Sequence, residues 1–156
     1  MKITLLVVGK TTDKQLENMI QDYVERIGHY ASMEVRTVPE LRNAKSLTPA
    51  QQKENDSNNI LAVLPDNADI FLLDERGTER RSIEFAEWIG KRLVAGRNIA
   101  FVIGGPFGFS EAMYKRANGL ISISKMTFSH QMIRLLFVEQ VYRAMTILKG
   151  EKYHHE

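Results

Sequence analysis

The sequence contains no cysteine among its 156 residues. Disulfide frameworks, thiolate nucleophiles and cysteine-ligated zinc or iron–sulfur sites are therefore excluded. It also lacks an excess of charge, since 21 basic residues face 19 acidic ones and leave a net charge of +2. This balance disfavours a protein that binds through bulk positive charge, but it is compatible with a local basic patch.

Long hydrophobic runs are missing as well. No apolar stretch approaches the roughly 18 residues that span a bilayer. The apolar segment at residues 3–8 is too short for a secretory signal, and polar residues follow from Lys10 without a small-residue cleavage site. We therefore expect a buried first strand in a soluble, cytoplasmic protein without membrane association. At this length the chain is expected to form a single domain, 1–156.

Apolar segments of strand length alternate with segments of helical periodicity. Thr48, Pro49 and Gln51 form a strong helix-start pattern, and Thr12 with Gln15 has the same capping-box spacing. The alternation predicts an α/β fold with a mostly parallel sheet between helix layers. Strands are expected at 3–8, 34–38, 70–73, 98–103 and 120–123, helices at 12–29, 48–64, 82–96, 110–117 and 130–149, and an irregular connection at 39–46.

The ends of the third, fourth and fifth expected strands carry residues that suit a ligand, because ligands of open parallel sheets bind beyond the carboxyl ends of the strands. Gly104 and Gly105 follow the fourth expected strand and permit close approach to the backbone. They match neither a dinucleotide fingerprint nor a P-loop, and a tight turn explains them equally well. Asp74 follows the third strand in an expected polar turn at 74–77, where an acid either holds a ribose hydroxyl or is simply solvated.

The fifth strand leads into a segment at 122–130 that is rich in hydrogen-bonding side chains. His130 lies at an expected helix start, where a structural or capping role is as compatible with the pattern as a catalytic one. The chain has no Ser/His/Asp triad order, no H-E-x-x-H and no metal-ligand cluster. Residue patterns alone therefore leave the chemistry of this segment open.

The last expected helix is apolar around nearly its whole circumference, so we expect it to be buried. A homodimer interface would supply a second wall for it, and the alternative is a central core helix. Glu139 and Arg143 have i, i+4 spacing and alone indicate only a surface pair. The tail 153–156 is by default a frayed end.

The sequence resembles the RlmH family of SPOUT-class methyltransferases, which modify a pseudouridine of large-subunit ribosomal RNA. The resemblance covers essentially the whole chain. It rests on Met1-Lys2-Ile3-Thr4, Val8-Gly9-Lys10, Phe101-Val102-Ile103-Gly104-Gly105-Pro106, Ser124-Lys125-Met126-Thr127-Phe128, Val138-Glu139-Gln140-Val141-Tyr142-Arg143-Ala144 and Tyr153-His154.

The resemblance implies a deep C-terminal trefoil knot, with the knot and the cofactor site within about 70–156. S-adenosylmethionine would bind there in a bent shape, held mainly by backbone groups. We expect Gly105 to leave space for this ligand beside its backbone. The family's cofactor residues carry over to Leu73, Asp74, Gly104, Gly105, Lys125, Met126, Thr127, Phe128, Ser129 and His130.

The implied reaction is N3-methylation of a pseudouridine in helix 69 of 23S ribosomal RNA, performed by a homodimer on the assembled ribosome and without a metal. Methyl transfer from a sulfonium depends mainly on positioning, but the ring nitrogen must first lose a proton. His154, Arg143, Glu139 and Tyr153 are the catalytic candidates, and the sequence does not rank them.

Two positions depart from the family pattern, and other functions remain to be distinguished. Ser129 replaces a proline before the loop histidine, where it can cap the following helix, and His155 replaces a basic residue. The main alternative function is a non-catalytic RNA-binding or ribosome-associated factor with the same fold. A methyltransferase for another RNA is a second alternative, whereas a dehydrogenase is disfavoured because the glycine loop lies late in the chain.

Overall fold

A five-stranded, all-parallel sheet forms the centre of the computed structural model, which describes residues 1–40 and 44–156. The strand order is β2-β1-β4-β3-β5. These observations confirm the predicted α/β class with a parallel sheet. The strands are β1 (Lys2–Val8), β2 (Ser32–Val38), β3 (Ala68–Glu79), β4 (Asn98–Ile103) and β5 (Gly119–Ser122).

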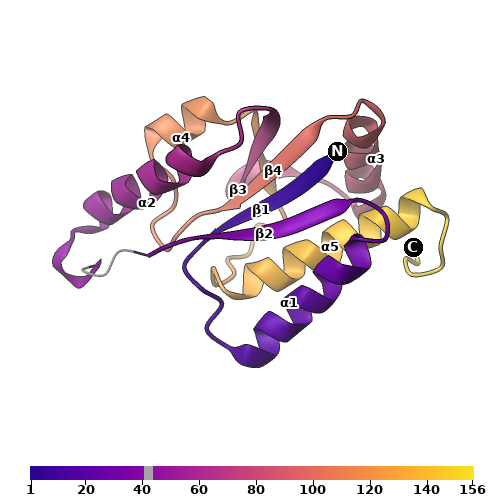
Figure 1. Ribbon diagram of the computed structural model, residues 1–156, viewed down its shortest axis with the longest axis horizontal. Helices are drawn as coiled ribbons and strands as arrows, with labels where there is room; N and C mark the ends of the chain where they lie inside the picture. Colours follow the sequence, from indigo (N-terminus) through magenta and orange to yellow (C-terminus); the bar gives the residue numbers. More distant parts are fainter. Residues whose placement is uncertain (41–43) are drawn as a thin grey trace.

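Helices cover both faces of this sheet and give three layers (Figure 1). On one face lie α1 (Lys14–Ile27), α3 (Ser82–Val94) and α5 (Met132–Leu148). On the other face lie α2 (Pro49–Val63) and α4 (Glu111–Arg116), and a single 3₁₀ turn, η1 (Ala44–Ser46), precedes α2. The right-handed crossovers that parallel strands require explain why helices separate most of the strands.

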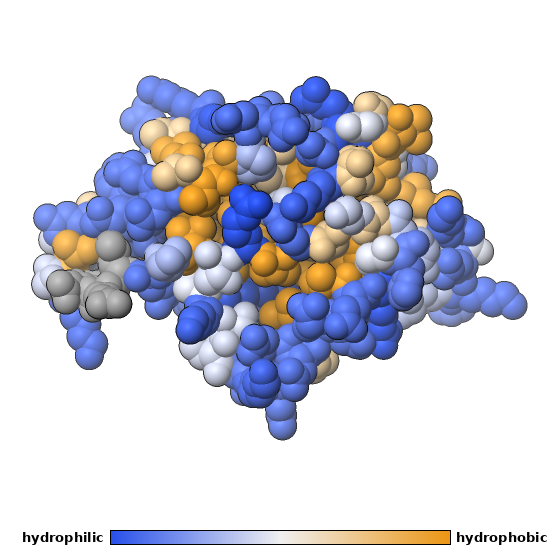
Figure 2. Space-filling view, in the orientation of Figure 1, coloured by the Kyte–Doolittle hydropathy of each residue, from blue (hydrophilic) through white to orange (hydrophobic). Residues whose placement is uncertain are grey.

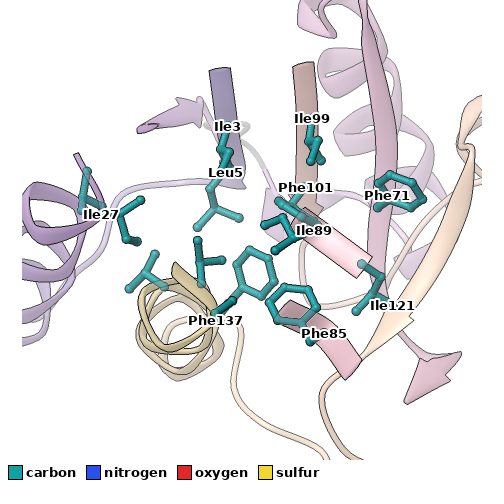
Figure 3. Close-up of a cluster of buried hydrophobic side chains, with 14 of the residues drawn as sticks. Ile3, Leu5, Ile27, Phe71, Phe85, Ile89, Ile99, Phe101, Ile121 and Phe137 are labelled. Carbon is teal, nitrogen blue, oxygen red and sulfur yellow. The ribbon is translucent and has the colours of Figure 1, made fainter. Parts of the chain in front are cut away.

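Alternation along each strand divides the interior into two cores. Ile3 and Leu5 of β1 point toward α1 and α5, whereas Leu6 points toward α2 and α4. In Figure 3, Phe101 of β4 and Phe137 of α5 meet edge to face, with ring centroids 4.7 Å apart. Burial on both faces explains the nearly continuous apolar runs in the strands.

Helix α2 begins as the sequence predicts, and α1 does not. The Gln51 N–H donates to Thr48 Oγ1 at 3.1 Å, and the Thr48 N–H donates to Gln51 Oε1 at 3.0 Å, which completes the capping box. In α1 the cap is Asp13, whose Oδ1 accepts from the Leu16 N–H at 3.0 Å. The predicted cap at Thr12 is wrong, because its N–H is bound instead to Gln131 Oε1 at 2.9 Å.

Strand β3 is longer than predicted, because the polar turn expected at 74–77 lies within it. Leu73 and Thr78 both pair with Ile121 of β5, so the ladder is interrupted over these residues and then resumes. A Cβ at Gly77 would lie 2.5 Å from the carbonyl carbon of Ile121, so only glycine permits this backbone crossing. The knot itself stays a prediction of the resemblance.

The connection predicted at 39–46 lies partly outside the described residues, and its last part forms η1. Figure 2 shows hydrophilic residues along most of the outer edge of the molecule, with hydrophobic ones over the central strands and near α3. Within the described part of the chain, no helix combines the length and hydropathy that a bilayer crossing requires.

Candidate active site

A cavity of about 1010 Å³ opens beside residues 73–76 of β3 and beyond the carboxyl ends of β4 and β5. Residues from all three predicted strand-end segments line it, so the structure brings these segments together. Lys125 is the one predicted cofactor residue that does not line the cavity. The others do: Leu73, Asp74, Gly104, Gly105, Met126, Thr127, Phe128, Ser129 and His130.

Asp74 is held at the cavity wall by two neighbours that also line it. The Tyr114 hydroxyl donates to Asp74 Oδ2, and Oδ1 accepts from the backbone N–H of Arg76 at 2.9 Å and from its Nε at 3.3 Å. Burial opposes ionisation of Asp74, but these hydrogen bonds outweigh it and place its pKa below the ordinary value. Burial and the bond to Asp74 raise the pKa of Tyr114. Asp74 is therefore an ionised hydrogen-bond acceptor, and Tyr114 stays protonated as its donor.

The glycine loop after β4 is a closed turn. The Gly108 N–H donates to the Gly105 carbonyl oxygen at 3.2 Å, with Pro106 and Phe107 in the central positions. Gly108 has a φ of +79°, a conformation that favours glycine. The turn thus presents Phe107 at its tip, beside the cavity.

The space beside Gly105 is not empty. A Cβ at this position would lie 2.5 Å from Asp56 Oδ2 of helix α2. The expectation that Gly105 leaves this space for a ligand is therefore wrong, because a side chain of the protein occupies it. Asp56 is only 3% exposed, and burial together with the nearby charge of Glu40 raises its pKa. Helix α2 thus packs against the glycine loop through Asp56.

The segment after β5 is stabilised by hydrogen bonds between its serine side chains and the backbone. The Met126 N–H donates to Ser124 Oγ at 3.0 Å. Ser129 Oγ accepts from the Met132 N–H at 3.0 Å, at the first turn of α5. Ser129 therefore performs the capping role predicted for it at this departure from the family pattern.

Arg134 ties this segment to the end of β1. Its side chain is 1% exposed, and its Nη2 donates to the Val8 carbonyl at 2.7 Å. Nη1 donates to the Gly9 carbonyl at 2.9 Å, and Nε donates to the His130 carbonyl at 3.0 Å. Burial lowers the pKa of Arg134. A single guanidinium thus joins three backbone carbonyls that belong to two segments far apart in sequence.

The four catalytic candidates meet in a second place, which we call the tail cluster: Glu139, Arg143, Tyr153 and His154. Glu139 Oε1 accepts from Arg143 Nη2 at 2.7 Å and from the Tyr153 hydroxyl at 3.0 Å. Arg143 Nη1 lies 3.1 Å from His154 Nδ1. The end of the chain is therefore packed back along α5 rather than frayed (Figure 1).

The hydrogen bonds of the tail cluster indicate where Tyr153 and His154 carry their protons. Burial, with hydrogen bonds to Tyr23 and Glu139, raises the pKa of Tyr153, so its phenol stays a donor. A guanidinium only donates hydrogen bonds, so His154 Nδ1 must be the acceptor in its contact with Arg143. In the neutral ring the proton then lies on Nε2, which is buried and has no hydrogen-bond partner within the described residues.

The tail cluster does not line the cavity of its own chain. Ile133 lines the cavity, and Glu139 lies six residues further along α5, a rise of about 9 Å. The predicted cofactor residues and the predicted catalytic residues thus form two separate groups in one chain.

Comparison with known proteins identifies the family of this chain. A family profile described as "Predicted SPOUT methyltransferase" matches residues 1–154. The chain belongs to the SPOUT methyltransferase family. Proteins named ribosomal RNA large subunit methyltransferase H are similar to it over 100% of both chains, with 54% identity in Bacteroides fragilis, 52% in Phocaeicola vulgatus and 45% in Flavobacterium johnsoniae.

Two solved structures resemble the fold of this SPOUT methyltransferase. A probable methylase family protein from Haemophilus influenzae has a TM-score of 0.55 at 14% identity, over 99% of this chain and 70% of the other. A probable methyltransferase from Bordetella pertussis has a TM-score of 0.53 at 12% identity, over 92% of both chains.

Sequence patterns did not single out three residues that shape the cavity of this SPOUT methyltransferase. Tyr114 lies on a helix of a single turn and a half, and Asp56 lies in the polar run 51–59. Arg134 interrupts an apolar helix, which is the only available signal for a buried, bonded cation. Their partners lie far away in sequence, so no local spacing reveals them. No group of three or more acidic or histidine side chains that could hold a metal ion occurs within residues 1–40 and 44–156.

Proposed function

We propose that this chain transfers a methyl group from S-adenosylmethionine to N3 of a pseudouridine in helix 69 of 23S ribosomal RNA, on the assembled ribosome. Full-length similarity to proteins named ribosomal RNA large subunit methyltransferase H supports the substrate. The observation that carries the proposal is the cavity, which gathers nine of the ten residues that match the family's cofactor site. A ribosomal substrate implies that the protein works in the cytoplasm.

The lining of the cavity fits the proposed methyl donor. Asp74, Glu75 and Glu111 line the cavity together with Lys53 and Arg76, so acidic side chains outnumber basic ones, which suits a cationic sulfonium. The cavity volume of about 1010 Å³ also leaves room for a second group. When bound, S-adenosylmethionine would supply the electrophilic methyl group. Asp74, with its oxygens oriented by Tyr114 and Arg76, would accept hydrogen bonds from the ribose of the donor.

The tail cluster would act on the proton and the charge of the target base. Arg143 is a permanent cation that stabilises an anionic ring nitrogen. Tyr153 keeps its proton, so it serves as a hydrogen-bond donor or a stacking surface rather than as a base. His154 would act as a base through Nδ1 only after its contact with Arg143 is broken. For His154 to accept a proton from the target base, the tail cluster must therefore rearrange from the geometry seen in the single chain.

Contact with a second copy of the chain would be one way to break the contact between His154 and Arg143. Met132, Leu136, Glu139 and Arg143 share one face of α5 by helical spacing, and none of them is buried. An interface on this face would bring the tail cluster of one subunit to the cavity of its partner. We propose a homodimer with such a shared site. Static light scattering at low micromolar concentration tests it, and a monomeric mass contradicts it.

The decisive experiment incubates the protein and labelled S-adenosylmethionine with ribosomes and, in parallel, with isolated ribosomal RNA. Transfer to ribosomes, lost in a variant that lacks residues 153–156, supports the proposal. If the truncation leaves both the methylation rate and the cofactor affinity unchanged, the tail has no role and His154 is misassigned. If calorimetry detects no binding of S-adenosylmethionine, the chain is instead a non-catalytic RNA-binding factor.

A further inference from the structure

Two phenylalanines are exposed in this protein, and both line the cavity. Phe107 is 45% exposed and Phe128 is 37% exposed, whereas every other phenylalanine of the chain is at most 7% exposed. Met126, also in the lining, is 76% exposed. We call Phe107, Met126 and Phe128 the aromatic rim. Exposed apolar side chains gathered at one opening indicate a surface that contacts a partner.

Phe107 is held at its position by the turn that carries it. Pro106 has a restricted φ, and the hydrogen bond between Gly105 and Gly108 closes the turn around Phe107. The backbone that carries the ring is therefore constrained. An aromatic ring has few rotatable bonds, so on such a backbone it loses little conformational entropy when a flat partner stacks on it.

The opposite side of the rim is also constrained. Ser124 Oγ accepts from the Met126 N–H, and Ser129 Oγ accepts from the Met132 N–H, so Phe128 lies between two fixed points of the chain. The two phenylalanines come from loops that follow different strands, β4 and β5. The opening of the cavity is thus bordered by aromatic side chains from two independent segments.

The charges of the lining restrict which ligand enters the cavity between Phe107 and Phe128. The lining contains three carboxylates, at Asp74, Glu75 and Glu111, and two cations, Lys53 and Arg76. Arg76 is paired with Asp74, and Lys115 outside the lining is paired with Glu111, so the described residues of the lining include no unpaired cluster of cations to hold an anionic phosphate, whereas an uncharged nucleobase needs none. Bases that are taken out of a stack are recognised by stacking on aromatic side chains, and enzymes that modify a base extrude it into a pocket.

We propose that the aromatic rim stacks on the RNA base that enters the cavity beside the methyl donor, with Phe107 as its main platform. This inference rests on the proposed function, because it takes RNA as the substrate. The protein has a net charge of only +2, so attraction to the RNA backbone is weak and stacking makes a large share of the recognition.

Phe107→Ala tests the proposal, with Phe107→Trp as the variant that keeps a stacking face. The alanine variant should lower kcat/KM for ribosomes by roughly 5- to 100-fold. The tryptophan variant should recover most of that loss, and neither should change the affinity for S-adenosylmethionine measured by calorimetry. Val94→Ala is the matched control, because Val94 is 92% exposed on α3 and does not line the cavity.

Binding of a fluorescent single-stranded oligouridine, followed by anisotropy, tests the rim without methyl transfer. At least a fivefold loss of affinity in Phe107→Ala, but not in Val94→Ala, supports the inference. Equal affinities and equal kcat/KM overturn it. A loss of S-adenosylmethionine affinity that matches the loss of kcat/KM would place the ring on the adenine of the donor. A change of mass in light scattering would place it against a second copy of the chain.

Wild-type protein that binds oligouridine through Phe107 but methylates no ribosome would contradict the proposed function and leave the stacking role intact. If Phe107→Ala methylates ribosomes as well as the wild-type protein does, only the stacking role is contradicted. The two failures are therefore distinguishable.

Discussion

The cavity and the tail cluster differ in how completely their groups are satisfied. The cavity leaves exposed apolar rings and open volume beside a fixed donor–acceptor pair, Tyr114 and Asp74. In the tail cluster, Glu139, Arg143 and Tyr153 are bonded to one another, and the acceptor nitrogen of His154 is already used. The comparison indicates that one region is formed to receive a ligand, whereas the other must change its partners before it can act.

The largest effect should appear when the arginine that holds the segment beside the cavity, Arg134, is compared with the arginine of the tail cluster, Arg143. Arg134→Met leaves the carbonyls of Val8, Gly9 and His130 without their donor, so we expect a loss of about 3–5 kcal/mol in unfolding free energy. Arg143→Met removes an ion pair whose side chains are 25% and 19% exposed, and it should lower the unfolding free energy by less, about 1–2 kcal/mol. Urea denaturation measures both. Equal losses would contradict the distinction between the fully buried Arg134 and the partly exposed Arg143.

Arg134→Lys keeps the charge but not the three-way geometry, so it should fall between wild type and Arg134→Met. It also provides a folded variant if the methionine protein does not fold. In that variant, cofactor affinity should decline together with stability, because the clamp holds the segment that leads to His130.

A side chain at Gly105 tests the support beneath the cavity. Gly105→Ala places a methyl group against Asp56 Oδ2, and we expect about 1–3 kcal/mol of destabilisation. Asp56→Ala in the same chain should recover part of this loss, because it removes the obstructing carboxyl group. A double-mutant cycle by thermal unfolding measures the coupling. Additive effects of the two substitutions would show that the contact is not the cause.

Tyr153→Phe removes the hydrogen bond from the Tyr153 hydroxyl to Glu139 and its longer contact with the Tyr23 hydroxyl. The ring still packs against Tyr142, with centroids 4.8 Å apart, so we expect only about 1 kcal/mol of destabilisation. Tyr30→Phe is the matched control, since it removes a hydrogen bond from Tyr30 to Glu151 outside the cluster. Methylation should fall in the first variant and not in the second. Equal rates in both would remove the Tyr153 hydroxyl from the reaction.

The smallest effect concerns two acids near the glycine loop and the cavity wall. The pKa of Asp56 is raised, so its contribution to stability is present at low pH and is lost as pH rises through that pKa. The pKa of Asp74 is lowered, so its contribution is present above the unfolded-state pKa near 4 and is lost as pH falls. Asp56→Asn should therefore stabilise the protein at pH 7, whereas Asp74→Asn should destabilise it there.

The Asp56→Asn difference should shrink as the pH falls towards about 4, because the folded protein protonates Asp56 above that value. The Asp74→Asn difference should shrink only as the pH falls below about 4, because the folded protein keeps Asp74 ionised to lower pH. Thermal unfolding of the two variants and of wild type between pH 3 and pH 8 provides the comparison. Shifts of the same sign at pH 7 would contradict the opposite environments of the two carboxyl groups.

The fold was predictable from sequence wherever the signal is local. Apolar runs in β1 and β4 and the capping box at Thr48 have periods or spacings of a few residues, and the structure confirms them. The cap of α1 was not predictable, because Asp13 and Thr12 are both good capping residues and a distant Gln131 binds the Thr12 backbone. The prediction of a turn after Leu73 was wrong because of another long-range contact: pairing with β5 resumes at Thr78, so the strand continues.

By itself, the sequence determined the α/β class, the order of the elements and the loops that form the cavity, because hydrophobic periodicity and turn residues act over short distances. Its resemblance to a family also indicated the chemistry. Only the tertiary structure decided that Asp56 fills the space beside Gly105, that Arg134 clamps β1 to α5, and that the tail cluster stands apart from the cavity. These contacts join residues far apart in sequence, and their geometry depends on how the layers pack rather than on any local pattern.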